Sequence, residues 1–177
     1  MLRKDFFNRD TETVAEDLIG KFAVREIGGK EISAMITETE AYDGRADKAS
    51  HASKGRTART EVMFGQPGKF YVYLCYGMHF MLNVVTREAG YPAAILIRGV
   101  VPATSEEIRL NGPGKVTKFL KIDKGLNDRK VGQGAGLWFE DRGMVVSKNK
   151  VKRTPRIGVA YAGPVWSAKR LRFVMGD

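Results

Sequence analysis

The pattern of apolar and polar positions predicts a short helix at the start of the chain, followed mainly by strands. Apolar residues recur at helical spacing between Asp10, a good N-cap, and Gly20, which can end the helix. Along residues 22–27 and 31–39 apolar and polar residues alternate, and the two glycines between these segments favour a tight turn. These residues therefore predict a helix and then an antiparallel pair of strands.

Aromatic and β-branched residues are concentrated in residues 70–86, on both sides of a single glycine, which predicts a β-hairpin. Residues 43–66 show no sustained period and are rich in glycine, serine, lysine and arginine, so we expect a long loop. A capping-box pattern at residues 104–107 predicts a helix that residues 111–112 end, and the next proline can start another. Further strands are expected at residues 93–97, 137–140, 144–147, 156–160 and 171–174.

The fold class that follows is α+β, as a single domain over residues 1–177. We expect a curved, mainly antiparallel β-sheet, a few short helices and a protruding β-hairpin. With 177 residues, 43% of them hydrophobic, the chain is long enough to bury a core and short enough for one domain.

Two carboxylates stand where the second predicted strand runs out. The alternation along residues 32–36 defines a buried face, and the same alternation places Glu38 and Glu40 on that face. Carboxylates on an apolar face are costly to bury unless they are paired or used. Tyr42 and a basic loop that carries His51 follow, so the sequence favours a cleft in which an acid faces an aromatic ring, a histidine and several cations.

Tyr76 lies at the tip of the predicted hairpin, where a core tyrosine is not expected. An aromatic side chain at such a tip has the shape of a wedge that can open a stack of bases. A tyrosine that merely covers the end of a hairpin is the other interpretation. Further along, Asn83 shares a strand face with Met81 and Val85, so it needs hydrogen-bond partners if it is buried.

The charge of the chain points to a polyanionic partner. There are 30 lysine and arginine residues against 20 aspartate and glutamate residues, a formal net charge of +10. The same surplus can also simply keep a small protein soluble. One cysteine, Cys75, excludes an intrachain disulfide, and with only His51 and His79 no zinc-ligand set can be assembled, so neither a metal nor another cofactor is expected.

No signal peptide and no segment of the roughly 20 apolar residues of a membrane span stands out in the sequence. The sequence therefore predicts a soluble, cytoplasmic protein without a membrane partner.

Several long motifs occur in order along the chain. They are Glu-Thr-Glu-Ala-Tyr at residues 38–42, Ser-His at 50–51, Met-Phe-Gly-Gln-Pro-Gly at 63–68, the hairpin sequence Tyr-Val-Tyr-Leu-Cys-Tyr-Gly-Met-His-Phe-Met-Leu-Asn at 71–83 and Ile-Leu-Ile-Arg at 95–98. Together they closely resemble the 3-methyladenine (alkyladenine) DNA glycosylase family. The resemblance continues through residues 111–115, 156–159 and 166–173, so it covers nearly the whole chain.

The resemblance implies an enzyme that extrudes alkylated or deaminated purines from duplex DNA and hydrolyses the N-glycosidic bond, the first step of base excision repair. Glu40 matches the family's general base, and Arg98 matches the arginine that helps to hold the attacking water. An arginine partner would also keep Glu40 ionised, although an ion pair without a catalytic part is the alternative for these two residues. Glu38 matches no catalytic position and is interpreted as structural, a partner for an arginine. No nucleophilic lysine is needed, so a monofunctional enzyme is expected.

The resemblance also implies a base-binding pocket. Tyr42, His51 and Tyr73 match residues that stack on and hydrogen-bond the extruded base. Tyr76 matches the DNA-intercalating tyrosine that fills the gap in the minor groove. Asn83 matches a residue whose amide crowds the 2-amino group of guanine. From the residues alone, Tyr73 can be a core tyrosine, His51 a surface histidine and Asn83 an organiser of strand backbone.

The expected partner is duplex DNA with a damaged purine, bound by a monomer. Two other functions stay open on the residues alone. One is a non-catalytic nucleic-acid-binding module, and a weaker one is a hydrolase of free nucleosides or nucleotides.

Overall fold

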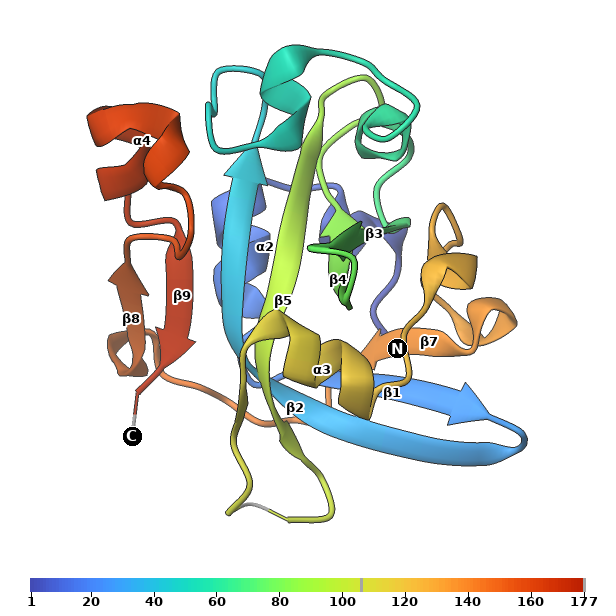
Figure 1. Ribbon diagram of the computed structural model, residues 1–177. Helices are drawn as coiled ribbons and strands as arrows, with labels where there is room; N and C mark the ends of the chain where they lie inside the picture. Colours follow the sequence, from blue (N-terminus) through green and yellow to red (C-terminus); the bar gives the residue numbers. More distant parts are fainter. Residues whose placement is uncertain (106, 177) are drawn as a thin grey trace.

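One antiparallel sheet organises the molecule. The computed structural model describes residues 1–105 and 107–176, and in this part of the chain nine strands join in one sheet with the central order β3-β4-β5-β2-β1-β7. The strands are β1 (Phe22–Ile27), β2 (Lys30–Asp43), β3 (Phe70–Cys75), β4 (His79–Val85), β5 (Ala93–Pro102), β6 (Leu110–Asn111), β7 (Leu137–Glu140), β8 (Val151–Thr154) and β9 (Arg172–Met175). The sheet curls along β2, whose two halves run in different directions (Figure 1). The α+β class and the antiparallel sheet are confirmed.

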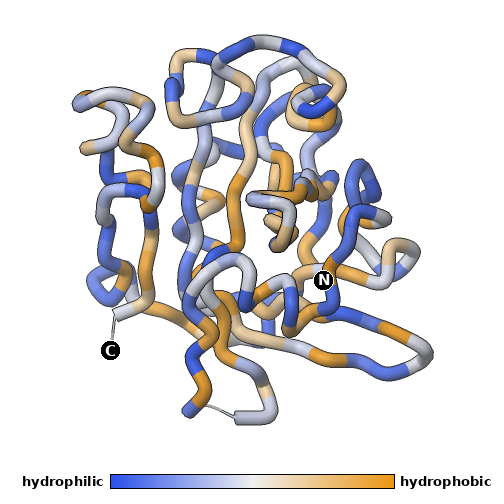
Figure 2. Tube along the Cα trace, viewed as in Figure 1, coloured by the Kyte–Doolittle hydropathy of each residue, from blue (hydrophilic) through white to orange (hydrophobic). Residues whose placement is uncertain are grey.

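Short helices surround the sheet. They are α1 (Lys4–Phe7), α2 (Thr11–Asp17), α3 (Pro113–Phe119), α4 (Gly163–Ala168) and the 3-10 helices η1 (His51–Lys54), η2 (Glu61–Phe64), η3 (Lys124–Leu126), η4 (Gln133–Ala135), η5 (Lys148–Lys150) and η6 (Ala160–Ala162). Helix α2 begins as predicted, because the side chain of Asp10 accepts the backbone N–H of Thr13 at 3.0 Å. It packs against β2 and β5. Most of β5 is apolar (Figure 2), with Arg98 as its charged residue.

Strand β2 has two different neighbours on one edge. Residues 30–35 pair with β1, whereas residues 38–40 pair with β9, and β5 covers the other edge. The long strand therefore carries the C-terminal segment, with β8, β9 and α4, beside its own C-terminal half (Figure 1). This arrangement brings residues from the end of the chain next to Glu38 and Glu40.

The pairing of β2 with β5 is interrupted at one point. Paired residues are Ile36 with Val100, Glu38 with Gly99 and Thr39 with Ile97. Each strand thus has one residue without an opposite partner, Thr37 in β2 and Arg98 in β5. Such bulges re-aim the side chains that follow them.

The bulge reverses the faces of β2. Ile36, before the bulge, is fully buried in the main core, whereas after it the inward residue is Thr39, which donates its hydroxyl to the Ala15 carbonyl oxygen at 2.8 Å. Glu38 and Glu40 consequently point to the opposite face of the sheet. Their burial was predicted correctly, but their placement on the face of Ile36 was wrong, because the alternation assumed an uninterrupted strand.

Three other predicted elements differ from the structure. Residues 144–147 and 156–160 are not strands, and the strand of this region is β8. Glu106, a member of the predicted capping box, lies outside the described residues. Leu110–Asn111, at the expected end of that helix, is instead the short strand β6, which pairs with β5.

Candidate active site

A row of side chains crosses five strands on the face to which Glu40 points. In successive strand pairs Tyr71 lies opposite Asn83, Asn83 opposite Leu96, Leu96 opposite Glu40, and Glu40 opposite Arg172. Residues directly opposite each other in antiparallel strands project to the same side. The sheet thus places an acid, an arginine, an asparagine and a tyrosine in one line.

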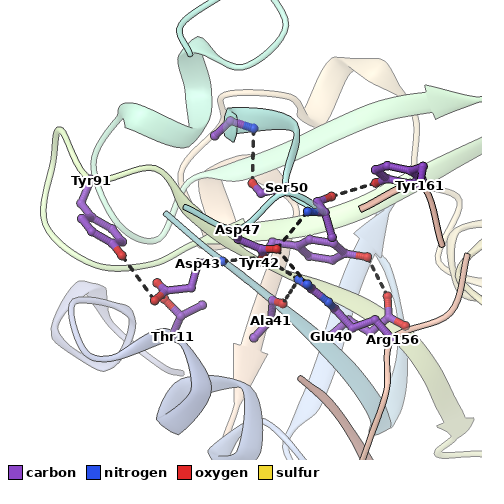
Figure 3. Close-up of polar contacts among 12 residues, drawn as sticks. Thr11, Glu40, Ala41, Tyr42, Asp43, Asp47, Ser50, Tyr91, Arg156 and Tyr161 are labelled. Atoms are coloured by element: carbon purple, nitrogen blue, oxygen red, sulfur yellow. Dashed lines mark hydrogen bonds and ion pairs between the residues drawn. The ribbon is translucent and has the colours of Figure 1, made fainter. Parts of the chain in front are cut away.

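Glu40 is fully buried and both of its carboxylate oxygens are held. Oε2 accepts the hydroxyl of Tyr42 at 2.8 Å, and Oε1 accepts the backbone N–H of Ile157 at 2.8 Å (Figure 3). Burial raises the pKa of Glu40 above its usual value, and the Arg98 guanidinium and the two hydrogen bonds offset only part of this effect. Arg98 thus acts in the direction expected from the sequence, towards the ionised carboxylate, but its effect on the pKa of Glu40 is smaller than that of burial.

Arg98 binds Glu38 more closely than Glu40. Its Nε lies 2.9 Å from Glu38 Oε1 and 3.6 Å from Glu40 Oε1. Arg172 Nε reaches the same Glu38 oxygen at 2.6 Å. The predicted role of Glu38 as a partner for an arginine is confirmed, and the carboxylate serves two of them.

A pocket opens beside Glu40, and aromatic side chains supply half of its lining residues. Its lining includes the four sequence candidates Tyr42, His51, Tyr73 and Asn83, together with Ala49, Ser50, Met63, Tyr71, Ala94 and Tyr161. The structure thus brings together all four residues for which a pocket role was expected. No lysine is among these lining residues of the described chain.

His51 forms one wall of the pocket with Tyr73. Its ring meets that of Tyr73 edge-on, with centroids 4.8 Å apart, and its Nδ1 lies 2.9 Å from the Tyr71 hydroxyl. The guanidinium of Arg59 covers Tyr73, 4.7 Å from the ring centroid. Burial, with Arg59 and Lys54 nearby, lowers the pKa of His51 to about 4, so the imidazole is neutral at physiological pH.

Tyr42 is backed by a buried ion pair. The guanidinium of Arg156 lies 4.7 Å from the Tyr42 ring centroid, and it binds both carboxylate oxygens of Asp47, at 2.5 and 2.8 Å. Arg156 also donates to the Ala41 carbonyl oxygen at 2.8 Å. Figure 3 shows these groups converging on Tyr42 and Glu40. The Tyr42 ring therefore packs against the guanidinium of Arg156.

Asn83 is buried, and its amide nitrogen is fully used. Nδ2 donates to the carbonyl oxygens of Tyr71 at 2.9 Å and Met81 at 3.3 Å. An amide NH₂ has two hydrogens, so these contacts fix the side-chain orientation. Asn83 thus organises strand backbone and also lines the pocket.

Tyr76 lies at the hairpin tip, outside the pocket. Its side chain is 90% exposed, and the flanking Leu74 and Met78 are 48% and 72% exposed. Tyr76 has a φ of 51° and Gly77 a φ of 68°, so the turn places a bulky residue in the left-handed region. The exposed apolar tip is a protruding feature of the hairpin, as expected.

No group of three or more histidine, cysteine, aspartate or glutamate side chains with a metal-site arrangement occurs among residues 1–105 and 107–176. In the same residues, no helix has the length and apolar character needed to cross a membrane.

Comparison with known sequences decides the family. The model of the methylpurine-DNA glycosylase family matches residues 5–177. This chain belongs to that family. Membership confirms the resemblance found in the sequence motifs and the prediction of an enzyme of the DNA glycosylase class.

Methylpurine-DNA glycosylase relatives from distant organisms align with the chain over most of their length. A protein of Methanocella arvoryzae is 47% identical over 176 residues, which cover 92% of this chain and 86% of the relative. One from Rickettsia felis is 46% identical over 177 residues, with coverage of 100% and 94%. One from Legionella pneumophila is 42% identical over 176 residues, with coverage of 99% and 94%. Each is named "putative 3-methyladenine DNA glycosylase".

Several residues around this pocket were missed in the sequence. Tyr161 lines the pocket and donates its hydroxyl to the Ala49 carbonyl oxygen at 2.8 Å, although the residue is 70% exposed. Asp47 and Arg156 are 109 positions apart, so no local pattern links them. The N–H of Ile157 belongs to a loop that the sequence predicted to be a strand.

Proposed function

We propose that the chain is a monofunctional DNA glycosylase that flips a damaged purine out of duplex DNA and hydrolyses its N-glycosidic bond. The substrate class is alkylated or deaminated purines, such as 3-methyladenine, 7-methylguanine, hypoxanthine and ethenoadenine. The observation that carries the proposal is the buried carboxylate of Glu40 beside an aromatic pocket. Residues 1–177 act as one glycosylase domain, as a monomer on DNA in the cytoplasm.

Glu40 is the general base in this mechanism. Each carboxylate oxygen has two lone pairs, and each accepts one hydrogen bond from the protein, so one acceptor position per oxygen remains for a water molecule. The raised pKa strengthens the carboxylate as a proton acceptor. As the bond between C1′ and the purine nitrogen breaks, the water oxygen attacks C1′, its proton passes to Glu40, and the electron pair of the broken bond leaves with the base.

Arg98 assists from the neighbouring strand. Its Nε is bound to Glu38, and its terminal nitrogens have no hydrogen bond to a described residue, so they can hold the attacking water. A guanidinium beside C1′ would repel the developing sugar cation, so its pairing with Glu38 rather than Glu40 suits the reaction.

The pocket selects the base. Tyr42 supplies one stacking surface, with Arg156 on its ring, and Tyr73 with His51 supplies another wall. Asn83 is fixed by its two backbone contacts and cannot turn away from a 2-amino group, which disfavours guanine. Tyr76 enters the minor groove and replaces the flipped nucleotide in the stack.

The test is single-turnover cleavage of labelled duplexes that carry one hypoxanthine, ethenoadenine or 3-methyladenine-type lesion, with alkali to reveal abasic sites. Wild type should produce breaks, and Glu40→Gln should abolish them while DNA affinity is kept. The matched control is Glu26→Gln, since Glu26 is exposed on β1. Tight, salt-sensitive binding without breaks on any lesion would instead support a non-catalytic nucleic-acid-binding module.

A further inference from the structure

Four charged side chains meet at the bulge between β2 and β5. Glu38, 5% exposed, accepts the Nε of Arg98 at 2.9 Å and the Nε of Arg172 at 2.6 Å on the same oxygen, Oε1. Arg172 is also anchored through its Nη1, which donates to Thr154 Oγ1 at 3.1 Å. Two carboxylates, Glu38 and Glu40, thus balance two guanidinium groups.

We propose that Glu38 is a positioning residue, which holds Arg98 away from Glu40 and so keeps Glu40 available as a base. The proposal rests on the proposed function, in which Glu40 and Arg98 flank the attacking water. Two distances support the proposal. Arg98 Nε lies 2.9 Å from Glu38 Oε1 but 3.6 Å from Glu40 Oε1, so it is 0.7 Å closer to Glu38. A guanidinium placed directly on Glu40 would occupy the lone pair that the water needs.

The backbone is shaped for this contact. A Cβ at Gly99 would lie 2.8 Å from the Glu38 Cβ and 3.2 Å from Thr37 Oγ1, so a side chain at position 99 would push β2 and β5 apart. The unpaired residue of β5 is Arg98 itself. The bulge therefore sets Glu38 and Arg98 side by side, and the missing side chain at Gly99 lets Glu38 approach.

Removal of the Glu38 charge has a predictable consequence. Arg98 and Arg172 would lose their shared partner, and Glu40 would be the nearest remaining carboxylate for Arg98. A charge-assisted hydrogen bond between Arg98 and Glu40 would then form and favour the ionised carboxylate. Loss of the like charge of Glu38 acts in the same direction.

Other charged and polar groups also face Glu40. They are Tyr42 on β2, Arg156 and the Ile157 N–H in the loop after β8, Tyr161 in η6, Arg98 on β5 and Arg172 on β9. Of these groups, Arg98 and Arg172 are the ones bound to Glu38, so a change in the titration of Glu40 reports the removal of the Glu38 charge and the movement of Arg98.

The experiment compares wild type with Glu38→Gln and Glu38→Asp in single-turnover excision from pH 4 to pH 9, with DNA affinity measured alongside. Glu38→Gln should shift the acidic limb of the rate profile to lower pH by about one unit. It should also reduce the maximal rate by about a hundredfold, since Arg98 is displaced, with DNA affinity nearly unchanged. Glu38→Asp retains the charge, so the acidic limb of its rate profile should lie where that of wild type does. Its loss of maximal rate should be smaller than that of Glu38→Gln.

A second measurement is independent of catalysis. NMR titration of the Glu40 side-chain carboxyl carbon, assigned by its loss in Glu40→Gln, should give a lower midpoint in Glu38→Gln than in wild type. The matched control is Glu16→Gln, which removes a carboxylate bound to Arg153 at 2.7 Å. Glu16 belongs to α2, which packs on the face of β2 opposite to Glu40, so both profiles should stay unchanged.

An unchanged Glu40 midpoint, or a higher one, in Glu38→Gln would overturn the proposal. If Glu38→Gln does not fold, Glu38→Asp decides, because a full wild-type rate in that variant would show that the position of the carboxylate is irrelevant. Absence of excision by wild type would refute the proposed function instead, and the titration would still decide whether Glu38 holds Arg98 away from Glu40.

Discussion

Tyr42 follows Glu40 by two positions in β2 and donates its hydroxyl to Glu40 Oε2 at 2.8 Å. The two side chains share a face of β2 beyond the bulge, and the Tyr42 ring also lines the pocket. One side chain therefore contacts both the carboxylate and the cavity proposed for the base. In the proposed mechanism this contact couples the stacking surface to the general base.

Replacement of Tyr42 by phenylalanine separates these two tasks. The ring remains, but Glu40 loses a hydrogen bond that stabilises its ionised form, so the pKa of Glu40 should rise further. The acidic limb of the single-turnover rate profile should move to higher pH, with DNA affinity nearly unchanged. This direction is opposite to that expected for Glu38→Gln.

The neighbouring histidine does not obscure that measurement. The pKa of His51 is lowered to about 4 whereas that of Glu40 is raised, so His51 takes up its proton at lower pH than Glu40 does. A limb that moved to lower pH in Tyr42→Phe would contradict the proposed action of this hydrogen bond.

Glu40→Gln should stabilise the protein at neutral pH while abolishing excision. The folded protein binds a proton at Glu40 more tightly than the unfolded chain does, since the pKa is raised on folding. The contribution of Glu40 to stability is therefore present at low pH and is lost as the pH rises through the folded pKa. A glutamine escapes this loss and can keep an acceptor for the Ile157 N–H.

Thermal unfolding at several pH values tests this prediction. The variant should melt about 2–4 °C above wild type near pH 7.5, the shift that about 1 kcal/mol produces in a chain of this length. The difference should shrink as the pH falls through the pKa of Glu40. A variant that is less stable than wild type at neutral pH would show that the burial of ionised Glu40 does not destabilise the folded protein.

Local features of the sequence were sufficient for much of the fold. Asp10 caps the start of the first helical segment, and Gly20, with a φ of 85°, follows its end. Both signals depend only on residues close together in the chain, so the sequence alone could predict them. The β-hairpin follows equally from its own residues. The bulge at Thr37 and Arg98 depends on the pairing of two strands 60 residues apart, so the alternation along β2 could not reveal it.

The same limit applies to the site. The family motifs led to the predictions for Glu40, Arg98 and the pocket residues, which lie in short segments of distinctive sequence. They did not identify Asp47 as the partner of Arg156, because that pair forms only when the C-terminal segment lies beside β2. Val159, predicted to lie in a strand, packs instead in a small cluster with Ala49 and Ala162. A loop whose apolar residues are buried can show the same alternation of apolar and polar residues as a strand, which explains the wrong prediction for residues 156–160.

The hairpin tip offers a test of function without loss of stability. Tyr76 is 90% exposed, so replacing it removes little packing, and asparagine tolerates its φ of 51° better than tyrosine does. Tyr76→Asn should therefore leave Tm unchanged or slightly raised. It should nevertheless weaken capture of a flipped ethenoadenine, measured by stopped-flow fluorescence, more than it slows the chemical step.

Val145→Asn is the matched control for the hairpin variant. Val145 is 93% exposed and lies outside the hairpin, so this change removes an equally exposed apolar side chain. It should alter neither Tm nor flipping. Unchanged flipping in Tyr76→Asn would count against the wedge.

Asn83→Ser should broaden the choice of base and lower stability. The shorter side chain leaves room for the 2-amino group, so guanine excision should rise above the undetectable background expected for wild type. The carbonyl oxygens of Tyr71 and Met81 would lose their buried donor, at a cost of about 1–3 kcal/mol. Excision from duplexes with an unmodified guanine, together with urea unfolding, measures both effects. A destabilised variant that still rejects guanine would leave Asn83 with its backbone role alone and would place the discrimination elsewhere in the pocket.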